Sequence, residues 1–177
     1  MKSRERVQLA LNHQQPDCVP LDLGAAPTTG MHVSSVYLLR QALQLDQPGT
    51  PVKVIEPYQM LGEISLDLMD VLGVDVIGLW PQGNLFGFRN EGWKPWTLFD
   101  NTPVLVPEAF NTTPEPDGSI LMYPEGDRSI EPSGRMPARG FYYDSLPRTV
   151  LPEDYTLNIE ENLEEFSHVS EEERDYF

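Results

Sequence analysis

Five polar or aromatic residues carry the side chains best suited to hold a small molecule. They are Asp22, Thr29, His32, Trp80 and Arg135, and we predict them as substrate-binding residues, with no catalytic residue assigned. Asp22 and His32 border a loop of small residues, in which Thr29 offers a hydroxyl group to a polar ligand. Trp80 offers an aromatic wall to a flat ligand. The guanidinium of Arg135 suits a carboxylate or a phosphate.

Each of these residues also has a structural interpretation, which the sequence leaves open. Asp22 could instead accept backbone hydrogen bonds, and Thr29 belongs to a loop whose composition is typical of plain turns. Trp80 could pack in the core, and Arg135 could pair with one of the many acidic residues of the chain. His32 is the one histidine that we expect near a pocket.

The potential metal ligands are few and scattered. The chain has one cysteine, Cys18, and three histidines, His13, His32 and His168, which form no spaced ligand motif. We therefore predict no metal site within this chain. A lone cysteine forms no intrachain disulfide, which favours a reducing, cytoplasmic location. Cys18 itself is predicted to be a small hydrophobic residue of the core.

Composition and charge narrow the classes of partner. The 177 residues are 40% hydrophobic, which is enough for one sizeable core, and the formal net charge is −16. Such a chain gains nothing from counterion release on phosphates, so we expect no nucleic acid partner. Apolar runs are only a few residues long, which predicts no membrane span and no signal peptide. Ten acids and one base fall in residues 151–177, a pattern typical of a solvated helical tail.

The elements that would position these residues begin with a helix over residues 3–13. A short, mostly apolar segment over 18–23 is predicted as a buried strand, and a loop of small residues over 24–30 follows it. A helix is predicted over 32–43, and a further strand is expected over 52–57.

A second unit repeats the order of helix and strand. Helical spacing over residues 63–72 ends at Gly73, the residue type that favours a left-handed helix end, and a buried strand is predicted over 74–79. This order is typical of an α/β protein with a parallel sheet. Because such folds keep their chemistry in the loops that follow the strands, we expect a site at the loops after Leu23 and Leu79.

From Phe86 the pattern changes to short strands joined by turns. Strands are predicted over 96–100, 103–107 and 119–123, and they form an antiparallel hairpin excursion from the α/β frame. The predicted organisation is one domain over residues 1–177, with βα units over 1–85, the hairpin and loop excursion over 86–150, and the acidic helical tail over 151–177.

Several motifs of this chain resemble the opening of one known superfamily. They are Ser3-Arg4-Glu5-Arg6-Val7 with His13, Pro16-Asp17 and Val19-Pro20; Leu72-Gly73-Val74-Asp75-Val76; Gly126-Asp127-Arg128-Ser129 to Pro132-Ser133-Gly134-Arg135-Met136-Pro137; and Gly140-Phe141-Tyr142-Tyr143-Asp144. Together they resemble the N-terminal half of the uroporphyrinogen decarboxylase superfamily, which also contains the methylcobamide:coenzyme M methyltransferases and other corrinoid methyltransferase-like proteins. The resemblance implies the N-terminal portion of a (β/α)8 TIM barrel, incomplete because a full barrel needs about 250 residues.

Departures from the family pattern favour the methyltransferase-like branch over the decarboxylases. The decarboxylases carry Arg-Gln-Ala-Gly-Arg soon after the first strand, whereas Arg40-Gln41-Ala42 continues as Leu43-Gln44 inside a predicted helix. They also present an aspartate at the place where this chain has Trp80. Asp75 comes too early in its predicted strand to replace that aspartate, and a hydrogen-bonded structural carboxylate explains it better.

The resemblance then implies a corrinoid-linked methyltransferase-like enzyme. In that branch a zinc ion, held by a His-x-Cys pair and a distant cysteine, binds the thiol that accepts the methyl group of a methylcobamide. Those ligands lie in the C-terminal half of family members, so zinc and a cobamide are expected only when the complete barrel is assembled. The implied partners are a small-molecule or corrinoid-protein substrate and a chain that supplies the C-terminal half-barrel. Alone, this chain is expected to be inactive.

Two other interpretations stay open. One is a uroporphyrinogen decarboxylase of porphyrin biosynthesis. The other is a non-catalytic truncated product or binding subunit, because an incomplete barrel exposes strand edges and apolar faces. Such surfaces favour self-association or pairing with another protein.

Overall fold

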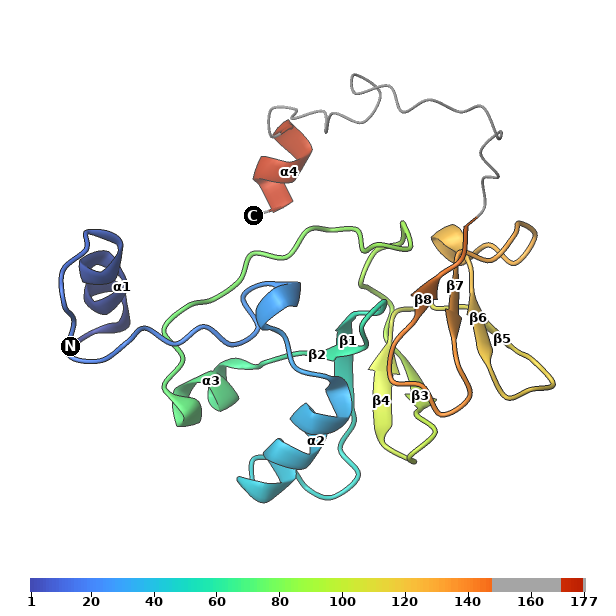
Figure 1. Ribbon diagram of the computed structural model, residues 1–177, viewed down its shortest axis with the longest axis horizontal. Helices are drawn as coiled ribbons and strands as arrows, with labels where there is room; N and C mark the ends of the chain where they lie inside the picture. Colours follow the sequence, from blue (N-terminus) through green and yellow to red (C-terminus); the bar gives the residue numbers. More distant parts are fainter. Residues whose placement is uncertain (148–169, 177) are drawn as a thin grey trace. The chain divides into compact units, whose positions relative to one another are not determined.

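The structure, a computed structural model, describes residues 1–147 and 170–176 (Figure 1). Its contacts divide the chain into two units, Met1–Leu146 and Pro147–Phe177. In the second unit helix α4 spans Glu171–Tyr176, and residues 151–169 of the predicted tail lie outside the described residues. All of the sites considered below lie in the first unit.

A four-stranded sheet in the first unit has the strand order β2-β1-β4-β3. Its strands are β1 (Val52–Glu56), β2 (Leu61–Gly62), β3 (Lys94–Thr97) and β4 (Pro103–Val106). Strand β1 pairs in parallel with β4, whereas β2 and β3 pair antiparallel with their neighbours. The strand expected over 52–57 and the hairpin expected between 96 and 107 are thus confirmed.

A second four-stranded sheet is antiparallel throughout, with the order β5-β6-β7-β8. Its strands are β5 (Thr112–Pro114), β6 (Ile120–Met122), β7 (Gly134–Met136) and β8 (Asp144–Ser145). Strand β6 matches the strand expected over 119–123. Strand β7 is not predicted, because it lies among glycine and proline residues that are typical of a loop.

Three α-helices belong to the first unit, and each matches a predicted helix with shorter bounds. They are α1 (Ser3–Leu11), α2 (Val33–Ala42) and α3 (Leu66–Leu72), and two short 3-10 helices span Pro27–Thr29 and Pro124–Gly126. Gly73 ends α3 with a φ angle of +69°, the left-handed conformation that its residue type predicts. None of the helices in the described ranges has the length and apolar character that crossing a bilayer requires.

The core combines aliphatic side chains from α2, α3, β1 and β4 with an aromatic cluster near the second sheet. The aliphatic part includes Val33, Val36, Val54, Leu68, Val104 and Val106, all of them fully buried. In the aromatic cluster, the ring of Phe86 stacks with Phe88 at 6.2 Å between centroids and meets Tyr143 edge-on at 5.5 Å. Tyr143 directly precedes β8, so this cluster ties the second sheet to the rest of the unit.

The prediction of a TIM-barrel portion is wrong. Its two characteristic strands, over residues 18–23 and 74–79, form no ladder in the structure. In a barrel both neighbours of β1 would run parallel to it. Here β4 is parallel to β1, but β2 occupies the other edge and is antiparallel. The unit is instead a small mixed α/β fold with two mostly antiparallel sheets.

The two segments that fail to form strands are joined through Asp75. The backbone N–H of Asp75 donates to the carbonyl of Leu21 at 2.8 Å, and the Asp75 carboxylate accepts from the N–H of Leu21 at 3.0 Å. The same carboxylate pairs with Arg6, and hydrogen bonding and this ion pair hold its pKa below the ordinary value. Asp75 is therefore the hydrogen-bonded structural carboxylate that the sequence favours. Cys18 in the first segment is exposed, so its prediction as a core residue is wrong.

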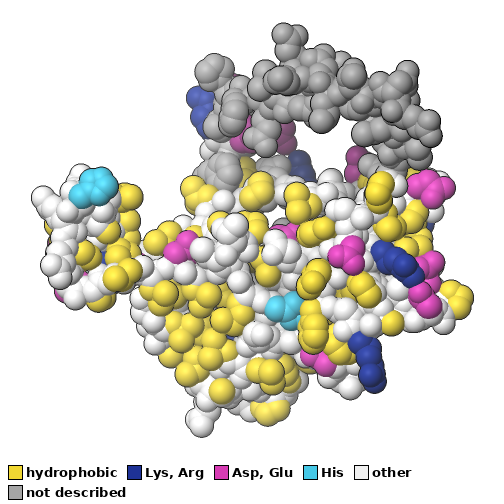
Figure 2. Space-filling view, viewed as in Figure 1, with side chains coloured by type: hydrophobic (Ala, Val, Ile, Leu, Met, Phe, Trp, Pro, Cys, Tyr) yellow, Lys and Arg dark blue, Asp and Glu magenta, His cyan; other side chains and the backbone are white. Residues whose placement is uncertain are grey.

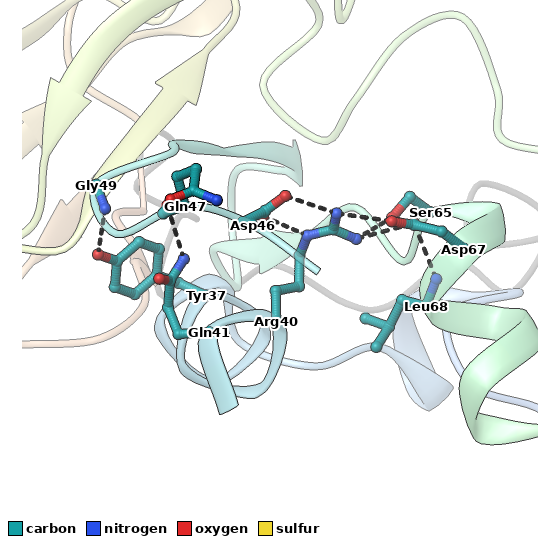
Figure 3. Close-up of polar contacts among 9 residues, drawn as sticks. All are labelled: Tyr37, Arg40, Gln41, Asp46, Gln47, Gly49, Ser65, Asp67 and Leu68. Carbon is teal, nitrogen blue, oxygen red and sulfur yellow. Dashed lines mark hydrogen bonds and ion pairs between the residues drawn. The ribbon is translucent and has the colours of Figure 1, made fainter. Parts of the chain in front are cut away.

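Arg40 joins the end of α2 to the start of α3 (Figure 3). Its guanidinium pairs with Asp46 at 2.6 and 2.9 Å and with Asp67 at 3.0 and 2.9 Å, and it also donates to the hydroxyl of Ser65. The Arg40 side chain is 11% exposed. Because its donors are engaged within the fold, Arg40 acts as a structural clasp.

Candidate functional site

A cavity of about 370 Å³ lies at the C-terminal end of β1, where three loop segments meet. Residues 25–27 form one wall, residues 79–81 a second and residues 83–85 a third. The end of β1 contributes Ile55 and Glu56. The loops after Leu23 and Leu79, at which the sequence predicts a site, therefore meet at one cavity.

Among the described residues that line this cavity, Glu56 is the only one with a formal charge, and we call the space the Glu56 cavity. The residue is 4% exposed. Its two carboxylate oxygens accept from the backbone N–H groups of Tyr58 at 3.0 Å and of Gln59 at 2.8 Å. Burial raises the pKa of Glu56, and the two N–H groups oppose that rise. A buried carboxyl group of this kind suits acceptance of a ligand's hydrogen bond or transfer of a proton.

Glu56 is not among the residues predicted from the sequence, although the pattern of β1 contains a signal for it. Burial alternates along β1, so that Val52, Val54 and Glu56 are buried while Lys53 and Ile55 are half-buried. The pairing of β1 with β2 also contains an irregularity between Val54 and Glu56, a feature common beside functional sites. A glutamate in phase with two buried valines is the pattern that would have identified it.

The first wall of the Glu56 cavity is shaped by Asp22 and Thr29. Asp22 accepts from the backbone N–H of Ala25 at 3.1 Å and from the Thr29 hydroxyl at 3.2 Å. The backbone N–H of Ala26 also lies 3.2 Å from that hydroxyl. The structure thus brings these two predicted residues together, and there they fix the loop whose residues 25–27 line the cavity.

The first and second walls touch through Gly78. A Cβ atom at Gly78 would overlap the backbone carbonyl of Ala25, so only glycine allows the two loops to approach this closely. Leu79 and Trp80 directly follow this contact and line the cavity. The position of the aromatic wall therefore depends on one glycine.

The third wall is held to β1 by two asparagine side chains. The Asn90 amide donates to the carbonyl of Ile55 at 2.6 Å, and the Asn84 amide donates to the Asn90 side chain at 3.0 Å. The Asn84 side-chain oxygen accepts from the backbone N–H of Phe86 at 3.0 Å. These hydrogen bonds fix the third wall against the end of β1.

Trp80 is half-buried and lines two neighbouring cavities. One is the Glu56 cavity, and the other lies beside α3, with a volume of about 490 Å³. Ile55 also borders both. Trp80 therefore belongs to the lining that the two cavities share, and its role toward a ligand stays a prediction.

His32 lines a separate cavity of about 590 Å³ and has no free ring nitrogen. Its Nδ1 accepts from the backbone N–H of Ser34 at 3.2 Å, and its Nε2 donates to the carbonyl of Phe141 at 2.8 Å. This pattern requires the neutral ring, and burial lowers the pKa of His32 accordingly. His32 caps α2 and holds residue 141 in place.

Arg135 lies on β7 and lines neither cavity. Its guanidinium pairs with Asp117 at 2.5 Å and with Glu115 at 3.3 Å, and it donates to the Ser119 hydroxyl at 3.0 Å. The structure therefore places Arg135 apart from the other four predicted residues, in contact with acids of its own sheet.

The last two observations concern metal-binding groups in the described residues and similarity to known proteins. Within residues 1–147 and 170–176, no group of three or more histidine, cysteine, aspartate or glutamate side chains could hold a metal ion. Comparisons of the chain with protein-family models, with curated proteins and with solved structures find no match. The resemblance to the uroporphyrinogen decarboxylase superfamily stays a prediction.

Proposed function

We propose that the Glu56 cavity binds a flat, mostly apolar ring that carries an N–H donor, such as a pyrrole. The observation that carries the proposal is the buried Glu56 carboxylate, whose two oxygens each hold one backbone N–H. A carboxylate offers about four acceptor sites, so two remain for a ligand. The half-buried Trp80 supplies the aromatic wall for such a ring.

The size of the cavity and the resemblance of the sequence both support a pyrrole-containing ligand. A volume of about 370 Å³ lies at the small end of the range for ligand pockets and suits one or two rings. The superfamily that the sequence resembles acts on tetrapyrroles and corrinoids, and its porphyrinogen substrates contain pyrrole rings with an N–H donor. We propose binding by this chain, and we assign methyl transfer or decarboxylation to an assembly in which another chain supplies further groups.

Titration with pyrrole tests this proposal, with N-methylpyrrole as the matched ligand that lacks the N–H. We expect pyrrole to change the fluorescence assigned to Trp80 by comparison with Trp80→Phe, and N-methylpyrrole to bind at least about tenfold more weakly. Glu56→Gln should lose the preference for pyrrole. The control Glu131→Gln changes an exposed acid outside both cavities and should keep it. Equal binding of both ligands by the unmodified protein would rule the proposal out.

Self-association is a second candidate function, favoured by exposed apolar side chains near the Glu56 cavity. These side chains are Leu66 (64% exposed), Ile77 (66%), Leu79 (74%) and Leu85 (75%). Hydrophobic side chains also gather on the surface over α3 (Figure 2). An apolar surface of this kind suits a second copy of the chain.

Light scattering after size-exclusion chromatography tests the second candidate over a range of protein concentrations. We expect a dimer that dissociates on dilution, and we expect Ile77→Lys to shift it to monomer. Leu38→Lys changes an equally exposed leucine on α2 and should leave the dimer intact. A monomer at every concentration would exclude self-association.

The exposed, unpaired thiol of Cys18 supports our proposal that the protein is cytoplasmic.

A further inference from the structure

The 590 Å³ cavity is lined in part by the turn that follows Glu56. Glu56 lines the first cavity, whereas Tyr58 and Gln59, whose backbone N–H groups donate to its carboxylate, line this second one. Phe141 and Tyr142 line it from the segment before β8. We call this second space the aromatic cavity.

One wall of the aromatic cavity is fixed through Tyr58. The Tyr58 hydroxyl lies 3.0 Å from the Ser145 hydroxyl, and its ring lies 6.0 Å from the ring of Phe86. The Tyr58 carbonyl accepts from the backbone N–H of Tyr143 at 2.8 Å. These contacts hold the turn and the segment before β8 together without a ligand.

The opposite wall is fixed through Phe141. The Phe141 ring meets His32 edge-on at 5.2 Å and Phe99 at 4.8 Å. The Phe141 carbonyl accepts from His32 Nε2. Phe141 nevertheless keeps 47% of its surface exposed, and its neighbour Tyr142 keeps 57%. Both aromatic side chains are therefore available to a ligand, and that of Phe141 is already oriented.

The charge of the lining has one sign. Among the residues of the lining that the structure describes, Asp144 is the only one with a formal charge, because His32 is neutral and neither lysine nor arginine is present. Ser34 links this site to a second carboxylate, because its hydroxyl donates to Asp100 at 3.1 Å. Aromatic faces with nearby carboxylates attract cations, and a cation with bound methyl groups loses little hydration when it enters such a site.

We propose that the aromatic cavity binds a quaternary ammonium head group, with Tyr58, Phe141 and Tyr142 around the methyl groups and Asp144 at the opening. The chemistry differs from that of the Glu56 cavity, where a buried carboxylate accepts a hydrogen bond. A quaternary ammonium has no N–H to donate and depends on aromatic and electrostatic contact.

Calorimetric titration with choline, at fixed ionic strength, tests the proposal. Its neutral isostere 3,3-dimethyl-1-butanol has the same shape without the charge. We expect choline to bind about tenfold more tightly than the isostere, since the aromatic faces and the carboxylate of Asp144 attract its charge. We expect Tyr142→Leu to weaken choline about fivefold and Tyr142→Phe to leave its affinity within about twofold. Asp144→Asn should weaken choline and leave the isostere unaffected.

Three outcomes would overturn the proposal. The first is equal affinity for choline and its isostere, which would show a merely apolar cleft. The second is equal loss of binding in Tyr142→Phe and Tyr142→Leu, measured on variants whose circular dichroism matches the unmodified protein. The third is the absence of a heat signal together with unchanged amide resonances of Tyr58 and Tyr142. Binding of pyrrole at the Glu56 cavity is read separately, through Trp80, so each proposal fails or stands by itself.

Discussion

The Glu56 cavity and the aromatic cavity are connected by one turn of the chain, yet they place their carboxylates differently. Glu56 is 4% exposed and bound to two backbone N–H groups, whereas Asp144, in the lining of the aromatic cavity, is exposed. A buried carboxylate is strongly directional and favours a ligand that donates a hydrogen bond to it. An exposed carboxylate beside aromatic rings acts over a longer range and favours a cation. The same functional group therefore supports two different ligand classes.

The walls of the two cavities differ as well. Three loop segments around the end of β1 form most of the Glu56 cavity, and they depend on side-chain hydrogen bonds such as those of Asn90 and Asp22. The aromatic cavity is bounded by β8, the start of α2 and aromatic rings that meet edge-on. We therefore expect changes in loop contacts to affect pyrrole binding more than choline binding.

The largest expected effect is a loss of stability. It should leave the different ligand preferences of the two cavities unchanged. Arg40→Met leaves Asp46 and Asp67 without their cation, and we expect it to lower the free energy of unfolding by about 3 kcal/mol. Urea denaturation measures this loss. Arg40→Lys keeps the charge but lacks the planar guanidinium group. Its free energy of unfolding should therefore lie between those of Arg40→Met and the unmodified protein. A full recovery by lysine would contradict the account of Arg40 as a multidentate clasp.

The next effect should break one cavity and keep the other. Gly78→Ala forces a Cβ atom into the carbonyl of Ala25, and we expect a loss of about 2 kcal/mol in stability together with loss of pyrrole binding. Choline binding should persist in the folded fraction. Gly83→Ala is the matched control for stability, because a Cβ atom there meets nothing within 4 Å, although Gly83 also lines the cavity. Equal losses of stability in the two variants would show that the contact between the loops is unimportant.

A smaller effect should show how independent the cavities are. Glu56→Gln replaces one carboxylate oxygen, which accepts a backbone N–H of the turn, by an amide group. We expect it to lower the affinity for pyrrole about tenfold, or about 1.4 kcal/mol. Choline should change less than about twofold, because Tyr58 keeps its contacts with Ser145 and Tyr143. Parallel titrations of both ligands measure the ratio. A tenfold loss for choline as well would mean that the two cavities form one coupled site.

The smallest expected effect is a pH dependence of the wall that His32 supports. Folding lowers the pKa of His32 below its ordinary 6.5, so the unfolded chain takes up the proton first as the pH falls. The free energy of unfolding should therefore be highest above about pH 6.5 and decrease below it by less than about 1 kcal/mol. The hydrogen bond to the Phe141 carbonyl and the charge of Asp100 both oppose this lowering of the pKa and reduce the effect. His32→Asn, which keeps a capping side chain, should remove the slope between pH 5 and 6.5. If the free energy of unfolding of this variant depended on pH as in the unmodified protein, the pH dependence would come from other titratable groups.

Local patterns in the sequence predict the elements that depend on neighbouring residues. The helix that starts after His32, the left-handed end at Gly73 and the hairpin around Asn101 are all encoded within a few residues, and the structure contains them. The barrel prediction fails because it depends on distant pairing. Residues 74–79 have the composition of a strand, but β2 and β4 already occupy both edges of β1.

The candidate site is predictable in the same partial way. Trp80 and the loop containing Asp22 and Thr29 are found from their position after apolar segments, and both border the Glu56 cavity. Glu56 escapes detection because only its phase with Val52 and Val54 marks it as buried. Arg135 has the right chemistry for an anion, but the partners that satisfy it are brought near only by the pairing of β6 with β7.

The most direct test of the Glu56 cavity is the titration of its carboxyl carbon by nuclear magnetic resonance, with and without pyrrole. We expect Glu56 to titrate above the ordinary value of 4.5, because burial disfavours its charged form. Pyrrole should lower that pKa, since its N–H stabilises the carboxylate. N-methylpyrrole should leave it unchanged. If the pKa of Glu56 were ordinary and unchanged by either ligand, Glu56 would not be the buried hydrogen-bond acceptor on which the proposed function depends.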